Sequence, residues 1–126
     1  MPAKDRVEAF TAMVLSGRHD QAIADFYHPD ASMQENQDPP RVGRDGLVAQ
    51  ERATMARFAE IGTELMEPPL IDGDRVVVRW RFTFRPAEGP AMAMEELALQ
   101  RWSGDRIAEE RFFYDPRQLR PPKPTD

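Results

Sequence analysis

The sequence contains no cysteine, only two histidines and no long run of apolar residues. Without cysteine the protein has no disulfide bond and no thiolate metal site. The histidines, His19 and His28, lack the ligand spacing of a zinc site, so we expect neither a metal nor another cofactor. His19 falls in a turn, where we expect exposure to solvent. His28 precedes Pro29 at a corner, where a structural or exposed role is favoured over titration in a site.

Long apolar segments of the kind that target a chain to membranes are missing as well. No stretch approaches the ~18 apolar residues that a membrane-spanning helix needs. The start MPAKDRVEAF carries charges where a signal peptide has its apolar run. We therefore expect a cytoplasmic protein without a membrane partner. The formal net charge of −5 argues against nucleic acid, because binding to phosphates requires a basic surface.

The length of 126 residues fits one domain, and the 40% of hydrophobic residues suffice for one core. We expect this domain to cover residues 1–119. The proline-rich segment 120–126 is expected to form an extended or disordered tail.

Three helices are predicted in the first half of the chain. Val7, Phe10 and Val14 recur with helical spacing, and Gly17 ends that helix. A second helix is expected over 21–27 with Asp20 as its N-cap. A third is expected over 46–61, with Asp45 as its cap and Gly62 as its stop.

The second half reads as a series of strands. Residues 75–85 alternate between an apolar face and a face rich in arginine, which is the period of a strand with two different surroundings. Further strands are expected over 31–37, 63–70, 91–102 and 106–114, the second of them weaker and cut by Pro68 and Pro69, with turns at 72–74, 86–90 and 103–105. Helices followed by a meander of strands indicate an α+β fold.

Four segments of this pattern occur in a characteristic order: ADFYHPDA at 24–31, GRD at 43–45, DRVVVRW at 74–80 and WSGDRIAEERFFYD at 102–115. Together they resemble the SnoaL-like branch of the NTF2-like superfamily, over about residues 5–119. The resemblance implies a cone-shaped fold in which a curved mixed or antiparallel sheet wraps around N-terminal helices and encloses a pocket. The family includes polyketide cyclases, limonene epoxide hydrolase and relatives of ketosteroid isomerase, as well as pocket proteins without known chemistry.

The catalytic patterns of these relatives are altered in this chain. SnoaL-type cyclases end in Glu-His-Trp-Asp, and the matching residues here are Glu109, Glu110, Arg111 and Phe112, so Phe112 takes the place of the catalytic aspartate. The loop 34–40 resembles the proline-bearing loop of limonene epoxide hydrolase. Met33 and Glu35 stand at the positions of the tyrosine and the asparagine that support catalysis in limonene epoxide hydrolase.

The resemblance also fixes which strand residues should face the pocket. Val78 and Ala98 are expected to share the inward face with the lining. The residues expected to bind substrate are Met33, Thr54, Phe58, Trp80, Phe82, Met94, Glu110, Phe112 and Tyr114. A shift of one residue in register would turn each set outward. Glu110 has the alternative role of a solvated charge at a strand edge, and Tyr114 that of a core aromatic.

Two glutamates, Glu96 and Glu35, are the candidate catalytic residues. Glu96 interrupts an apolar series on its strand, and a carboxyl desolvated in such a site has the raised pKa of a general acid or base. The alternatives are that Glu96 points outward, pairs with an arginine or hydrogen-bonds to Tyr114. Glu35 lies close to a loop, which favours a non-catalytic role.

The outward face of strand 75–85 carries Arg79 and Arg81. A homodimer interface through the convex sheet face explains them, with Glu109 and Arg111 as partners across the two-fold axis. A plain solvent-exposed face and a nucleic-acid patch are the alternatives.

Three functions fit the sequence. The first is a cofactor-independent cyclase, isomerase or hydrolase that acts on a small apolar substrate with a carbonyl or an epoxide. The second is a protein that binds a small hydrophobic molecule without catalysis. The third is a dimeric interaction protein with a vestigial pocket.

Overall fold

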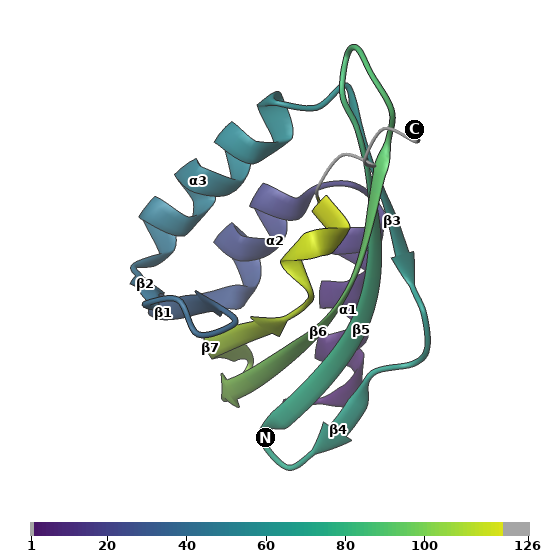
Figure 1. Cartoon of the computed structure of the whole chain (residues 1–126). Helices are drawn as coiled ribbons and strands as arrows, with labels where there is room; N and C mark the ends of the chain where they lie inside the picture. The colour runs from purple at the N-terminus through teal and green to yellow at the C-terminus, as the bar shows by residue number, and fades with distance from the viewer. Residues whose placement is uncertain (1, 120–126) are drawn as a thin grey trace.

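Three α-helices pack against one side of a curved sheet in residues 2–119, the part of the chain that the computed structural model describes (Figure 1). The helices are α1 (Lys4–Leu15), α2 (His19–Phe26) and α3 (Arg44–Ala56). The strands are β1 (Tyr27–Glu35), β2 (Arg41–Val42), β3 (Glu60–Leu65), β4 (Leu70–Asp72), β5 (Arg75–Arg85), β6 (Met92–Ser103) and β7 (Arg106–Phe113). A short 3-10 helix, η1 (Pro116–Leu119), follows β7.

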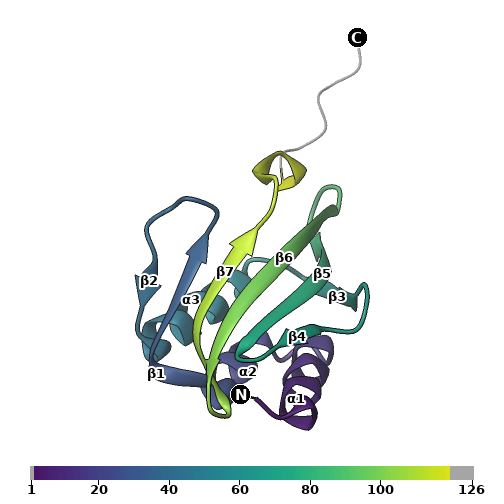
Figure 2. The ribbon, with the colours of Figure 1, turned by 90° about the horizontal axis from the view of Figure 1, so that it is seen from below.

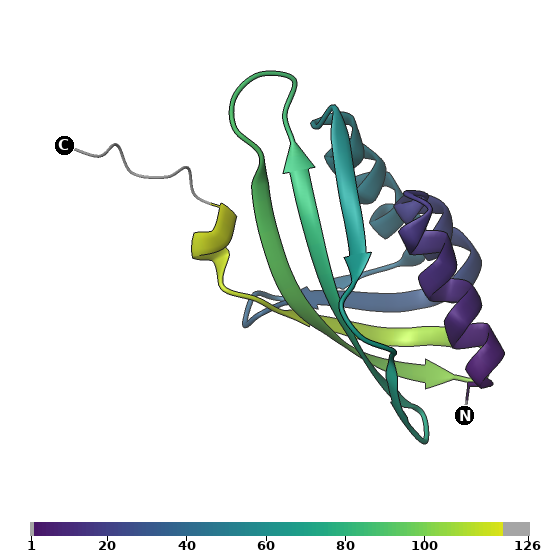
Figure 3. The same cartoon turned by 90° about the vertical axis from the view of Figure 1, so that its right-hand side faces the viewer.

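The sheet has the strand order β2-β1-β7-β6-β5-β3, and β4 pairs with the remaining part of the β5 edge. Its pairs are antiparallel except β1 with β7, which run parallel. Figure 2 looks onto the outer face of the sheet, with the helices behind it, and Figure 3 shows how the long strands β5 and β6 bend along their length. The predicted α+β class and the mixed, curved sheet are confirmed.

One end of the space between the helices and the sheet is filled by the core. Val7, Trp102 and Ile107 are almost fully buried there. The ring of Phe10 contacts Phe26 and Trp102 edge-on, with centroids 5.5 and 6.2 Å apart. Close packing of these large side chains closes this end.

The third helix is shorter than predicted. It ends at Ala56, and residues 60–65 form β3, so Gly62 lies inside a strand instead of stopping a helix. The cause is pairing with a distant strand, because Ile61 pairs with Phe84 and Gly62 pairs with Thr83 along the edge of β5. These pairings satisfy the backbone of both strands and override the helical spacing of the apolar residues.

Other boundaries also differ from the prediction. The strand predicted over 63–70 is cut at Pro68 and Pro69 as expected, since proline has no backbone N–H to donate, but its two parts extend further, as β3 from Glu60 and β4 to Asp72. Gly43 takes the N-cap position of α3, and its φ of 111° suits glycine, while Asp45 lies in the first turn. Asp20 lies in the first turn of α2, since the N-cap is Arg18, and Arg52 approaches its carboxylate to 3.0 Å.

The first strand, predicted over 31–37, is β1 at Tyr27–Glu35, because Tyr27 already pairs with Ile107 of β7. The other strands and turns follow the prediction closely. Residues 75–85 form β5 as expected, and Gly73 and Gly104 adopt positive φ in the two tight turns. The tail predicted over 120–126 lies outside the described residues. Within the described residues, no helix combines the length and the apolar character needed to cross a membrane.

Candidate active site

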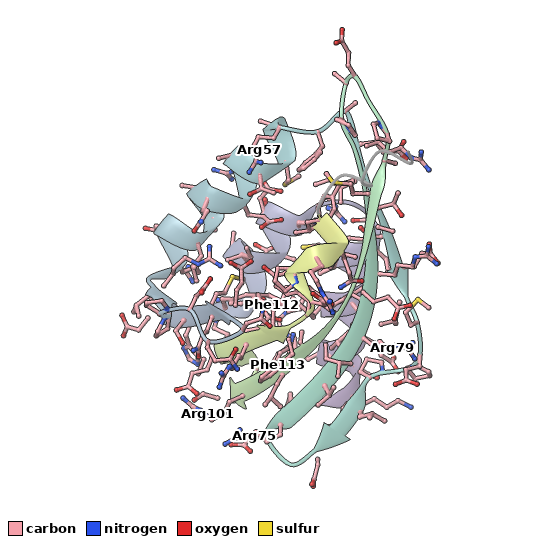
Figure 4. The ribbon with its side chains drawn as sticks, in the orientation of Figure 1. Arg57, Arg75, Arg79, Arg101, Phe112 and Phe113 are labelled. Atoms are coloured by element: carbon pink, nitrogen blue, oxygen red, sulfur yellow. The ribbon has the colours of Figure 1, made fainter. Side chains whose placement is uncertain are left out.

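A cavity of about 460 Å³ lies between the three helices and the inner face of the sheet. Ligand sites commonly measure roughly 300–1,000 Å³, so the cavity is large enough for a small molecule. Side chains from α1, α2 and α3 form one wall, and those from β5, β6 and β7 form the other. Figure 4 shows Phe112 in this interior space and Arg57 at the far end of α3.

The structure places the whole predicted set of site residues in the lining of this cavity. These residues are Met33, Glu35, Thr54, Phe58, Trp80, Phe82, Met94, Glu96, Glu110, Phe112 and Tyr114. Val78 and Ala98 share the inward face but are sealed in the core. The register on which the placement depends is therefore the expected one, and the catalytic or binding role of each residue stays a prediction.

Glu96 is a buried acid of the cavity wall that has no partner among the described residues. It lies in the middle of β6 opposite Trp80 of β5, and only 8% of its surface is exposed. In the described chain its carboxyl group forms no hydrogen bond and no ion pair. Burial raises the pKa of Glu96 to about 8, and the charges of Glu110, Glu35 and Glu51 contribute in the same direction.

The second buried acid, Glu110, is held in a hydrogen-bond chain. The hydroxyl of Tyr27 donates to Oε1 of Glu110, and the amide of Gln100 donates to Oε2 at 2.7 Å. The indole N–H of Trp102 donates to Gln100 at 3.0 Å, which fixes the orientation of the amide. Burial raises the pKa of Glu110 to about 7 although the two hydrogen bonds act to lower it. The alternative of a solvated edge charge is wrong, because Glu110 is 3% exposed.

The third acid, Glu35, belongs to the rim. It ends β1, its side chain is partly exposed, and its carboxylate lies 3.9 Å from the guanidinium of Arg41. Burial raises the pKa of the neighbouring Tyr114, and the charges of Glu35 and Glu96 and a hydrogen bond to Glu35 add to the effect. Glu35 is therefore a paired and solvated group, which makes it a weaker acid-base candidate than Glu96.

His19 is a lining residue that the sequence analysis missed. It opens α2 and is 9% exposed, not solvated in a turn. Its Nε2 lies 2.9 Å from the hydroxyl of Thr63, and its Nδ1 lies 3.6 Å from a carboxylate oxygen of Glu51. The ring also meets the edge of Phe82. The spacing of His19 to Ile23, four residues later on the buried face, is the signal that would have found it.

Two further polar groups lie where reasoning from the sequence did not put them. Tyr27, predicted as the end of a helix, is the first residue of β1 and reaches Glu110 through its hydroxyl. Glu51, on the inward face of α3, lines the cavity.

His28 lies away from the cavity. Its Nε2 is 3.0 Å from the carbonyl oxygen of Ser103, in line with the structural role expected for it. Among the described residues, no group of acids and histidines is arranged to hold a metal ion.

On the outer face of the sheet, ion pairs form within the chain, whereas the sequence led us to expect partners across a two-fold axis. Arg79 pairs with Glu95 at 3.3 Å and Glu109 pairs with Arg101 at 3.1 Å, both within the same chain. Cross-strand neighbours on one sheet face are close enough to form such pairs without a second molecule. Glu109 therefore already has a partner inside its own chain.

Comparisons with known proteins agree with the fold. Similar solved structures include a protein from Mesorhizobium loti described as a SnoaL-like polyketide cyclase (22% identity, TM-score 0.75, 90% of this chain and 100% of that chain). Another is an NTF2-like protein from Burkholderia pseudomallei (16% identity, TM-score 0.77, 91% of this chain and 92% of that chain). A third is a protein with a ketosteroid isomerase-like fold from Catenulispora acidiphila, solved in complex with trimethylamine (18% identity, TM-score 0.73, 87% of this chain and 85% of that chain).

Sequence comparison leads to the same family. No curated protein matches the sequence. The family model of the SnoaL-like domain matches residues 7–110, which run from within α1 to within β7 and include both buried acids. The chain belongs to the SnoaL-like domain family.

Proposed function

We propose that the protein is a cofactor-independent enzyme in which Glu96 moves a proton on a small, largely apolar substrate that carries a carbonyl group. The observation that carries the proposal is the unpartnered carboxyl group of Glu96 inside an apolar cavity. A carboxyl group that only maintained the fold would be paired or hydrogen-bonded, as Glu110 is.

The raised pKa of Glu96 suits proton transfer near neutral pH. With a pKa of about 8, the ionised form is present at neutral pH as a minor fraction and is a stronger base than an ordinary carboxylate. The carboxylate takes a proton from the carbon next to the substrate carbonyl. The resulting acid returns that proton to another carbon in an isomerisation, or to the alkoxide formed when the carbanion attacks a second carbonyl in a cyclisation.

The other polar groups of the cavity have supporting roles in this proposal. Glu110 is fixed by Tyr27 and Gln100, so it is available as a negative charge that keeps the pKa of Glu96 high. Glu35, the second candidate acid-base group, contacts the part of a substrate that reaches the rim. The rings of Trp80 and Phe82, stacked 5.9 Å apart, supply an apolar surface on which a flat substrate can pack.

Exchange of substrate hydrogen for solvent deuterium tests this proposal without knowledge of the natural substrate. A panel of small cyclic ketones and diketones is incubated with the protein in D2O, and incorporation of deuterium next to the carbonyl is followed by NMR. Glu96→Gln should abolish the exchange. Glu95→Gln removes the same charge one residue away on the outer face and should leave the exchange intact. Equal exchange with wild type and Glu96→Gln would show that Glu96 is not the base.

A second function, binding of a hydrophobic small molecule without catalysis, is favoured by Phe112. This apolar ring stands in the lining where the resemblance places the catalytic aspartate of cyclases. A pure binding protein would bind ligands from the panel and catalyse no exchange at any pH. Loss of turnover in Glu96→Gln with ligand binding retained would count against this function.

We also propose that two copies associate through the outer sheet face. Leu97 and Phe113 are partly exposed there, next to the alternating charges of Arg79, Arg81 and Glu95 (Figure 4 shows Arg79 and Phe113). A two-fold axis brings such a surface onto a copy of itself, so that the apolar residues are covered and opposite charges can meet.

A further inference from the structure

The lining of the cavity contains more acidic than basic groups. Four carboxyl groups reach it, from four different elements: Glu35, Glu51, Glu96 and Glu110. The basic side chains of the lining, other than His19, are Arg41 and Arg57. Arg41 is already engaged by Glu35 and by Gln50, and Arg57 is exposed, with its guanidinium 5.7 Å from the ring centre of Phe58. The deep part of the cavity thus has acids without a matching positive charge.

Among these four acids, Glu96 is the one whose carboxyl group has no partner within residues 2–119 of the protein. Every fully buried side-chain oxygen or nitrogen in the described residues has a hydrogen-bond partner. The carboxyl oxygens of Glu96 have none, so they are not sealed inside protein and must face the open space of the cavity. Because the side chain is more than nine-tenths buried, a ligand placed in the cavity is the group best able to pair with it.

The walls around this acid are aromatic. Trp80 and Phe82 stack on each other, Phe58 and Phe84 lie 5.0 Å apart, and all four line the cavity. The face of an aromatic ring is negative, and a cation within about 6 Å of a ring centre is attracted by up to roughly 2 kcal/mol when it is desolvated. An acid and several aromatic rings around one space supply the groups that recognise an organic ammonium ion.

We propose that the cavity binds a small organic cation, a protonated or quaternary amine with an apolar body, whose positive charge is balanced by the carboxylate of Glu96. This inference rests on the proposed function, because it assigns a substrate class to the same cavity. A cation near Glu96 favours the carboxylate over the acid, so the arriving substrate itself generates the base that the proposed reaction needs.

The acids around Glu96 favour this response. The titratable or charged groups that reach the cavity are His19 from α2, Tyr27 and Glu35 from β1, Arg41 from β2, Glu51 and Arg57 from α3, and Glu110 and Tyr114 from β7 and the segment after it, while α1, β3 and β5 contribute apolar side chains only. The acids among them repel a second negative charge, which contributes to the raised pKa of Glu96. A bound cation offsets this repulsion, so binding should release a proton from the protein near neutral pH.

Calorimetric titration with a matched pair of probes tests the inference. Choline carries a trimethylammonium group, and 3,3-dimethyl-1-butanol is its neutral isostere with the same shape. We expect choline to bind roughly tenfold or more tightly than the alcohol, the preference that a desolvated charge and ring faces supply. Its affinity should rise from about pH 6 to about pH 8 and then level off, with proton release detected in buffers of different ionisation enthalpy.

The variants separate this inference from the proposed function. Glu96→Gln should lose the preference for choline and keep the affinity for the alcohol, while Glu95→Gln should match wild type. The inference is overturned if the alcohol binds as tightly as choline, if neither probe binds, or if Glu96→Gln binds choline like wild type. Should wild type fail to prefer choline and still catalyse deuterium exchange with neutral ketones, the cationic substrate is wrong and the proposed function stands. The pH dependence of wild type tests the charge pairing even if the variant does not fold.

Discussion

Glu96 and Trp80 are register partners on neighbouring antiparallel strands, and both side chains turn into the same cavity. The pair sets a carboxyl group against one of the two tryptophans, at a point where both are nearly excluded from water. This arrangement disfavours the ionised form of Glu96 and leaves its oxygens facing the open space of the cavity. The proposals on catalysis and on ligand charge both depend on this relationship.

The first prediction concerns the dependence of activity on pH. Because the ionised form of Glu96 is the base, the rate of deuterium exchange should rise with pH up to about 8 and level off above it. Initial rates on one ketone measured from about pH 5 to about pH 9.5 give this profile. A rate that is flat across this range, or that falls toward pH 8, would contradict the assignment of the base.

The second prediction links Glu96 to stability. The folded-state pKa of Glu96 lies above its unfolded value, so the folded protein binds more protons between about pH 4.5 and about pH 8. The free energy of unfolding should therefore be largest below this window and fall as pH rises through it, on the order of 5 kcal/mol for this one group.

Substitution of Glu96 isolates its share of this effect. Glu96→Gln should remove the share of the slope that belongs to Glu96, leave the share of Glu110 below about pH 7, and make the protein more stable than wild type at about pH 8. Urea unfolding at a series of pH values measures the difference. Glu95→Gln, on the outer face, should keep the slope of wild type, and an unchanged slope in Glu96→Gln would show that Glu96 ionises normally.

The third prediction addresses the chain of hydrogen bonds that holds Glu110. Tyr27→Phe removes the hydroxyl that donates to Glu110 and leaves Gln100 as the remaining donor. Since that hydrogen bond lowers the pKa of Glu110, its loss should raise this pKa further, and stability should fall by roughly 1–3 kcal/mol at neutral pH. Urea unfolding at neutral pH checks the loss. Stability equal to that of wild type would mean that the hydroxyl does not support the carboxylate.

The fourth prediction tests the outer sheet face. Leu97→Asp places a charge in the apolar centre of the proposed interface and should convert a dimer into a monomer, as measured by light scattering during gel filtration. Leu15→Asp is the matched control, because Leu15 has a similar exposure of 42% but lies on α1. A wild-type protein that elutes as a monomer at high concentration would contradict the interface.

Reasoning from the sequence worked best where one strand has two contrasting faces. The alternation along residues 75–85 fixed the register of β5, and Glu96 stood out because it broke the same pattern on the neighbouring strand. The resemblance to the SnoaL-like branch indicated which residues of the neighbouring strands face inward, and the antiparallel pairing of β5, β6 and β7 agrees with it. The inward direction of Glu96, Phe112 and Tyr114 was thus expected from the resemblance.

The same reasoning failed where burial depends on contacts between distant segments. His19 is buried because β3 brings Thr63, 44 residues later, against its ring. The sequence predicted a strand that includes Thr63, but the position of that strand against α2 follows only from the folded sheet. The hydrogen bond from Tyr27 to Glu110 likewise joins β1 to β7, which are parallel neighbours only in the folded sheet. Local periodicity contains no information on such pairs.

The ionisation of Glu96 in the wild-type protein is the most direct test of the account. Its side-chain carboxyl resonance can be followed by carbon-13 NMR across the pH range, with Glu96→Gln used to assign the signal. The account predicts a midpoint at about pH 8. A midpoint at the ordinary value of 4.5 would show that the carboxyl group is solvated and would remove the basis for both the proposed base and the proposed cation site.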